Sequence, residues 1–133
     1  MTADSLWGPL PVTSETKPPI VFLREQAAAL KELTKGILVG DVRATAAGPN
    51  LAASLDVVAP ALDGYRVQIV QISHGVAFYP IVLMSSVTGQ TICNDEASFV
   101  QILKRILSSP ETHKIISALI AQSKVGWGGL GKG

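Results

Sequence analysis

The chain has 133 residues, with 11 basic and 10 acidic side chains and a formal net charge of +1. This length suits one domain, and the charge lacks the basic excess that nucleic acids and anionic membranes usually require, so we expect neither partner. Apolar residues make up 47% of the chain against 16% charged residues, more apolar surface than a small monomer readily buries, which favours self-association.

Composition divides the chain into three parts. Residues 1–17 are rich in proline, serine and threonine and predict an extended arm, and residues 125–133 form a glycine-rich tail. Between them, residues 18–124 have the periodic apolar pattern of one folded domain. The arm lacks the basic start and continuous apolar stretch of a secretion signal, and a single Cys93 suits a reducing compartment. We therefore expect a cytoplasmic protein.

The first predicted element is a helix that begins at the pair Pro18 and Pro19 and ends before Gly36. Proline is tolerated in the first turn of a helix, and glycine commonly follows the last turn. Apolar residues recur between these limits with near-helical spacing: Ile20, Leu23, Ala27, Leu30 and Leu33.

The middle of the chain predicts four antiparallel strands in sequence, separated by turn residues. Their predicted ranges are 37–46, 51–59, 65–73 and 77–87, with a short fifth strand at 90–93 as an open alternative. In the second strand, apolar residues alternate with Ser54 and Asp56, which predicts one face in water.

The third strand changes phase along its length. Val67 and Ile69 alternate with polar residues, whereas Val70 and Ile72 occupy the opposite parity. Either a β-bulge near Val70 or burial of both strand faces explains the change. The fourth strand is apolar on both parities, which favours burial of both faces.

Two helices follow the strands and complete the order αββββαα. Asn94 is the predicted N-cap of the first, whose apolar stripe ends at Leu107, and Ser109 and Pro110 start the second. The predicted fold class is α+β: a four-stranded antiparallel meander, five-stranded if the short strand forms, with one N-terminal and two C-terminal helices.

Residues 67–94 contain no formally charged side chain, which raises the question of a membrane span. A spanning helix here would place Gln68, Gln71 and His74 in hydrocarbon, and Pro80 would interrupt it. A buried β-hairpin accommodates the same residues, so we expect no membrane partner.

Three residues invite a catalytic interpretation, but none has the partners that catalysis requires. His74 lies in a predicted turn with no carboxylate at a spacing that fixes contact, which favours a turn histidine bonded to its own backbone. Cys93 precedes a helix and could pair with His113, but no local signature accompanies them, and a buried structural thiol is commoner. The sequence predicts no catalytic residue, no metal site and no cofactor.

Two tryptophans lie outside the predicted domain. Trp7 and Trp127 each stand next to glycine in segments without periodicity, and an exposed tryptophan is typical of an interface. The alternative is that each segment folds back and covers an apolar patch of its own domain.

We therefore expect a non-enzymatic protein-interaction or assembly module that forms a homodimer through the third and fourth strands and can bind another protein. The alternative is a small-molecule binding domain or minor hydrolase, with a pocket between the sheet and the C-terminal helices lined by Tyr65, Tyr79 and Phe99 and reached by His74. The predicted binding residues are Trp7, Tyr65, Arg66, His74, Tyr79 and Trp127.

Removal of residues 1–15 and 126–133 should leave the core folded, because neither segment has the periodicity that a core requires. We expect the truncated chain to melt within about 10 °C of the full chain. Thermal melting followed by circular dichroism measures this, and a larger drop would mean that Trp7 or Trp127 belongs to the core.

Overall fold

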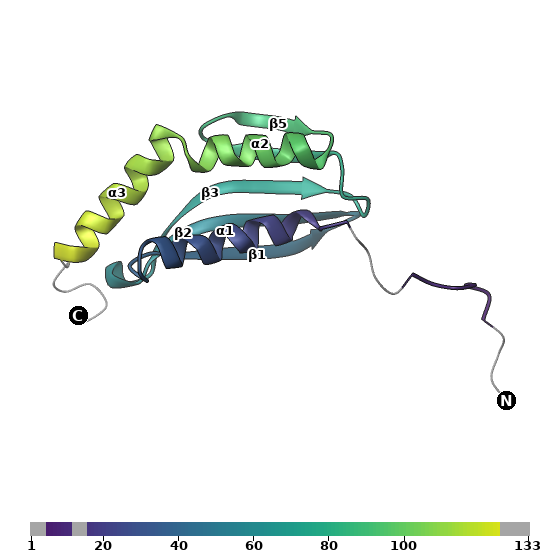
Figure 1. Cartoon of the computed structure of the whole chain (residues 1–133), viewed down its shortest axis with the longest axis horizontal. Coiled ribbons are helices and arrows are strands. Elements are labelled where there is room, and N and C mark those ends of the chain that lie inside the picture. Colours follow the sequence, from purple (N-terminus) through teal and green to yellow (C-terminus); the bar gives the residue numbers. More distant parts are fainter. Residues whose placement is uncertain (1–4, 12–15, 126–133) are drawn as a thin grey trace.

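The computed structural model describes residues 5–11 and 16–125 of the chain (Figure 1). It confirms the α+β class, with one helix, five antiparallel strands in a single sheet and two further helices. The elements are α1 (Pro19–Leu33), β1 (Val39–Ala47), β2 (Asn50–Ala59), a short 3-10 helix η1 (Pro60–Leu62), β3 (Tyr65–His74), β4 (Ile81–Ser85), β5 (Gly89–Cys93), α2 (Glu96–Leu107) and α3 (Pro110–Val125).

All three helices lie on one face of the sheet, which we call the inner face. The strands follow the order β1-β2-β3-β4-β5; α1 packs on β1 and β2, α2 on β3 and β5, and α3 on β2 and η1 (Figure 1). The rings of Phe22 in α1 and Phe99 in α2 meet edge to face at 5.8 Å. The buried core therefore lies between the inner face and the helices, and no helix of the described chain covers the outer face.

Helix α1 begins and ends where its proline and glycine predict. Pro19 is its first residue, and Leu23 and Ala27 are buried on one side of it. Gly36 adopts a left-handed conformation, with φ of 83°, and its N–H donates to the carbonyl of Lys31 at 2.8 Å. A side chain disfavours this conformation, so Gly36 stops the helix.

The contact between α1 and β1 is unusually close because Gly40 has no side chain. A Cβ atom at Gly40 would lie 2.4 Å from the Cα of Ala27 and 2.6 Å from its Cβ. Gly40 pairs with the buried Val57 of β2. The helix backbone therefore rests directly on the inner face of the sheet.

The phase change of β3 is a β-bulge. Leu55 pairs with Val70 and the next residue, Asp56, pairs with Gln68, so Ile69 is an extra residue in β3. Before the bulge Val67 faces the helices, and after it Val70 does. The bulge, and not burial of both strand faces, therefore explains the phase change of β3, so the explanation that the pattern of the fourth strand favoured is wrong for this strand.

Strand β4 is shorter than the predicted 77–87. It covers only Ile81–Ser85, because Pro80 offers no N–H to a neighbouring strand and the Ser85 hydroxyl accepts from the N–H groups of Val87 and Thr88 in a turn. The open alternative of a fifth strand is confirmed as β5.

The two C-terminal helices begin with side-chain caps. Asp95, rather than the predicted Asn94, caps α2: its carboxylate accepts from the N–H of Ser98 at 2.8 Å, and the Ser98 hydroxyl accepts from the N–H of Asp95. These bonds with Ser98 lower the pKa of the Asp95 carboxyl. Ser109 caps α3, as predicted, by accepting from the N–H of Thr112 at 3.1 Å.

Replacement of Gly40 by alanine should destabilise the fold by about 1–3 kcal/mol, because the new methyl group would overlap the backbone of α1. The matched control is Gly75→Ala, where a Cβ atom meets nothing within 4 Å and which should change the free energy of unfolding by less than about 0.5 kcal/mol. Urea unfolding of both variants measures the difference. Equal stabilities would contradict the close packing of α1 on β1.

Candidate functional site

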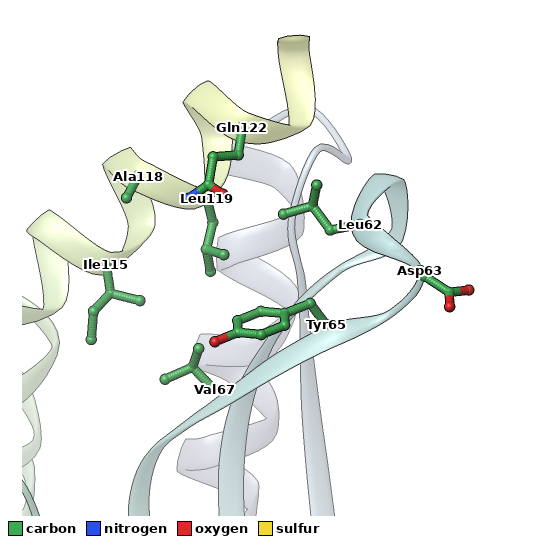
Figure 2. Close-up of a pocket in the computed structure, with 8 residues that line it drawn as sticks. All are labelled: Leu62, Asp63, Tyr65, Val67, Ile115, Ala118, Leu119 and Gln122. Atoms are coloured by element: carbon green, nitrogen blue, oxygen red, sulfur yellow. The ribbon is translucent and has the colours of Figure 1, made fainter. Parts of the chain in front are cut away.

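A cavity of about 720 Å³ lies between α3 and the turn that joins β2 to β3 (Figure 2). We call it the α3 cavity. Figure 2 shows side chains of α3 on one side of it and Tyr65, Val67 and Leu62 on the other. Its lining residues are Leu62, Asp63, Tyr65, Val67, Ile115, Ala118, Leu119 and Gln122.

Local sequence explains why these side chains meet. The 3-10 turn of η1 buries Leu62, and the left-handed residues Asp63 and Gly64 then reverse the chain so that β3 starts at Tyr65, opposite Ala59. On α3, Ala118 and Leu119 follow Ile115 by three and four positions and Gln122 follows it by seven, which places all four along one side of the helix.

The chemistry of the α3 cavity is that of an apolar binding site. Its polar groups are the Tyr65 hydroxyl, the Gln122 amide and the Asp63 carboxylate, and Figure 2 shows that carboxylate directed away from the other lining residues. Tyr65 is 56% exposed. Such a cavity can hold an aromatic or aliphatic group, with one hydroxyl and one amide for hydrogen bonds.

A second cluster of functional side chains lies on the outer face. Arg66 donates to Asp56 at 2.8 Å and to Asp41 at 3.0 Å, which joins β1, β2 and β3. Arg43 lies 3.6 Å from Asp41. Burial alone would lower the pKa of Arg66, but its bonds to the two carboxylates outweigh this and raise it. These four side chains therefore form a closed network of ion pairs across β1, β2 and β3.

Asp56 is the buried member of this network. Its side chain is only 6% exposed although β2 presents it to the outer face. Oδ2 accepts from Arg66, whereas Oδ1 has no hydrogen-bond partner within the described chain. The arginine therefore stabilises a carboxylate that is largely withdrawn from water.

The predicted binding residues do not converge on one site. Tyr65 lines the α3 cavity, whereas its neighbour Arg66 points to the outer face, because consecutive strand residues alternate. At the other end of β3, His74 Nδ1 lies 2.7 Å from the carbonyl oxygen of Gly75, the backbone contact expected for a turn histidine. Trp7 is 78% exposed, and Trp127 lies outside the described residues.

The pocket predicted from Tyr79 and Phe99 is filled. Phe99 is fully buried, and Tyr79 packs against it edge to face with 6.5 Å between ring centroids. The Tyr79 hydroxyl is buried without a partner among the described residues, and burial raises its pKa, with Glu96 and Asp95 adding to the effect. The cavity next to the C-terminal helices lies under α3 instead.

The environment of Cys93 opposes a nucleophilic role. Cys93 is fully buried at the end of β5, and burial raises the pKa of its thiol, with a smaller effect from Asp95. The thiol therefore stays protonated near neutral pH. His113 lies exposed on α3.

Sequence reasoning missed most of the residues that line the α3 cavity. Leu62 lies between the second and third predicted strands, and Ile115 and Leu119 lie in the last predicted helix, where apolar residues are expected to face the core. The signal that was available is Ala118 and Gln122 beside that stripe, since a small and a polar residue leave an apolar helix face incompletely filled.

Within residues 5–11 and 16–125, no group of three or more histidine, cysteine, aspartate or glutamate side chains could hold a metal ion. The same part of the chain has no helix with the length and apolar character needed to cross a membrane. No protein-family model, no curated protein and no solved structure matches the chain.

Loss of the arginine at the centre of the ion-pair network should destabilise the fold. In Arg66→Met the buried Asp56 carboxylate has no ionic partner, so we expect a clear fall in melting temperature. Arg43→Met, which removes an exposed side chain at 3.6 Å from Asp41, should have little effect.

A double variant separates the lost ion pair from lost packing. When Asp56→Asn is added to Arg66→Met, the double variant should regain part of the melting temperature that Arg66→Met loses, because an amide is less costly to bury than an unpaired carboxylate. Thermal melting of the three variants provides the measurement. An equal loss in Arg43→Met and Arg66→Met would refute the assigned role of Asp56.

Proposed function

We propose that this chain is a non-enzymatic protein-interaction module that assembles as a homodimer through the outer face of its sheet. The observation that carries the proposal is the placement of all three helices on the inner face. Met84 and Ile92 on the outer face are 49% and 59% exposed, beside the half-buried Val82. We call these three residues the outer strip.

The pairing of strands makes the outer strip continuous. Val82 on β4 stands directly opposite Ile92 on β5, and Met84 lies two residues further along β4. Polar residues flank the strip, because Ser73 pairs with Val82 and Gln71 pairs with Met84. An apolar centre with a polar rim is the usual organisation of a protein interface.

Charge favours a second copy of this chain as the occupant of the outer face. Asp41, Asp56, Arg43 and Arg66 form ion pairs with one another, so the two acids and two bases balance. Two such faces can pack around a two-fold axis without like-charge repulsion. A balanced face has no field to attract nucleic acid or an anionic membrane.

The positions of the polar groups support a non-enzymatic role. Arg66 is already bonded to two carboxylates, the thiol of Cys93 is buried, and His74 contacts its neighbouring backbone. The proposal includes a cytoplasmic location, since a lone buried thiol suits a reducing compartment.

Charges placed in the outer strip should abolish the dimer. At micromolar concentration we expect light scattering to give the full chain a mass of twice the 14.0 kDa of one copy. The double variant with Met84→Glu and Ile92→Glu should have the mass of a monomer, because the dimer would bury unpaired charges. Val76→Glu serves as the control, because Val76 is an 87% exposed apolar residue in the loop before β4. It should remain dimeric.

Two results would overturn this proposal. The first is a full chain that is monomeric at every accessible concentration, which would leave a different protein as the partner of the outer face. The second is a dimer that survives both glutamates, which would place the interface elsewhere, for example at the edge strand β1.

A further inference from the structure

We propose that residues 126–133 of the chain dock into the α3 cavity and that the indole of Trp127 fills it. This inference concerns the inner side of the molecule and is independent of the dimer proposed for the outer face. It rests on the chemistry of the cavity, on the place where α3 ends, and on the sequence of the segment that follows.

The cavity matches an aromatic occupant in chemistry and in size. Its walls are formed by Leu62, Val67, Ile115 and Leu119, and the exposed Tyr65 ring offers a surface for stacking or edge contact. A volume of about 720 Å³ lies within the range of about 300–1,000 Å³ of sites that enclose a small molecule. It has room for an indole and a second apolar side chain.

The chain leaves α3 at the right place. Val125, the last residue of the helix, is three positions after Gln122 and lies on the same side of the helix as this lining residue. Trp127 is two residues further on, and two extended residues span at most about 7 Å. Gly126 permits the reversal that directs the indole back over Gln122.

A second apolar residue of the segment follows at a matching distance. Leu130 is three residues after Trp127, which corresponds to about 10 Å of extended chain. The helix rises by about 10 Å between Ile115 and Gln122. A segment that runs antiparallel to α3 therefore brings Leu130 to Ile115 when Trp127 lies at Gln122.

Charge also favours this occupant. Asp63 is the one charged residue among those that line the cavity, and Lys132 is the one charged residue in 126–133. Their signs are opposite, so Lys132 meets no like charge among the residues that line the cavity. Any other molecule that binds in the α3 cavity must first displace this segment, so Trp127 competes with external ligands for the cavity.

Fluorescence of Trp127 tests the proposal in the full chain. Trp7→Phe leaves Trp127 as the single tryptophan. We expect its emission to be that of a buried indole, and its quenching by acrylamide to increase several-fold in Ala118→Arg, where a large charged side chain enters the cavity. Ala121→Arg is the control, since Ala121 is exposed on α3 without lining the cavity, and it should leave the quenching unchanged.

An apolar dye distinguishes the other possible occupants. Anilinonaphthalene sulfonate should bind Trp127→Ala several-fold more tightly than the full chain or Trp7→Ala. Equal binding by the full chain and Trp127→Ala would show that the cavity is open, as for a small-molecule site, and would overturn the proposal. Quenching that changes with protein concentration would assign the tryptophan to a second copy and would also overturn it.

The two proposals fail separately. Met84→Glu with Ile92→Glu should change the mass in light scattering while leaving Trp127 protected from acrylamide. Ala118→Arg should expose Trp127 while leaving the mass unchanged. Circular dichroism of each variant verifies that the fold is intact. Strong quenching of Trp127 by acrylamide in a folded Trp7→Phe chain would therefore contradict the docking proposal and would leave the dimer proposal unaffected.

Discussion

The arrangement of the whole domain depends on the close approach of α1 to β1 at Gly40. Without a side chain at this position, Ala27 rests on the sheet and α1 lies deep enough for Phe22 to reach Phe99 of α2. Helices α1 and α2, which are far apart in the sequence, thereby share one core on the inner face. Two surfaces result from the packing of the helices on the inner face. One is the uncovered outer face, and the other is the α3 cavity, where α3 extends over the end of the sheet.

Local signals predicted the order of elements well because they act within a few residues. Pro19, Gly36 and Ser109 mark helix limits through backbone chemistry alone, and the structure places them as expected. Strand lengths depend on partners that are distant in sequence. The fourth strand was predicted too long because it pairs only along the length of the short β5. Asp95, and not Asn94, caps α2 because the side chains of Asp95 and Ser98 each accept a hydrogen bond from the backbone N–H of the other residue.

The functional surfaces were predicted less completely. Alternation in the second strand predicted that Asp56 faces water, but it could not show that Arg66 covers this carboxylate and leaves it buried. The α3 cavity depends on the direction in which α3 leaves α2. At this junction the hydroxyls of Ser109 and Thr112 both donate to the carbonyl of Ile106. The angle between α2 and α3 depends on these local bonds and not on the spacing of apolar residues, so the periodic pattern of the sequence does not predict it.

The extra residue at Ile69 has a consequence for how this chain can change in length. Odd-numbered residues of β3 face the helices before the bulge and even-numbered residues face them after it. Deletion of Ile69 would remove the bulge and leave Val67 and Val70 facing the helices, whereas deletion of a residue near either end of β3 would turn the residues beyond it over. A single-residue deletion within β3 of related sequences should therefore fall at the bulge, and other changes in length should fall in the turns around Gly48 and Gly75.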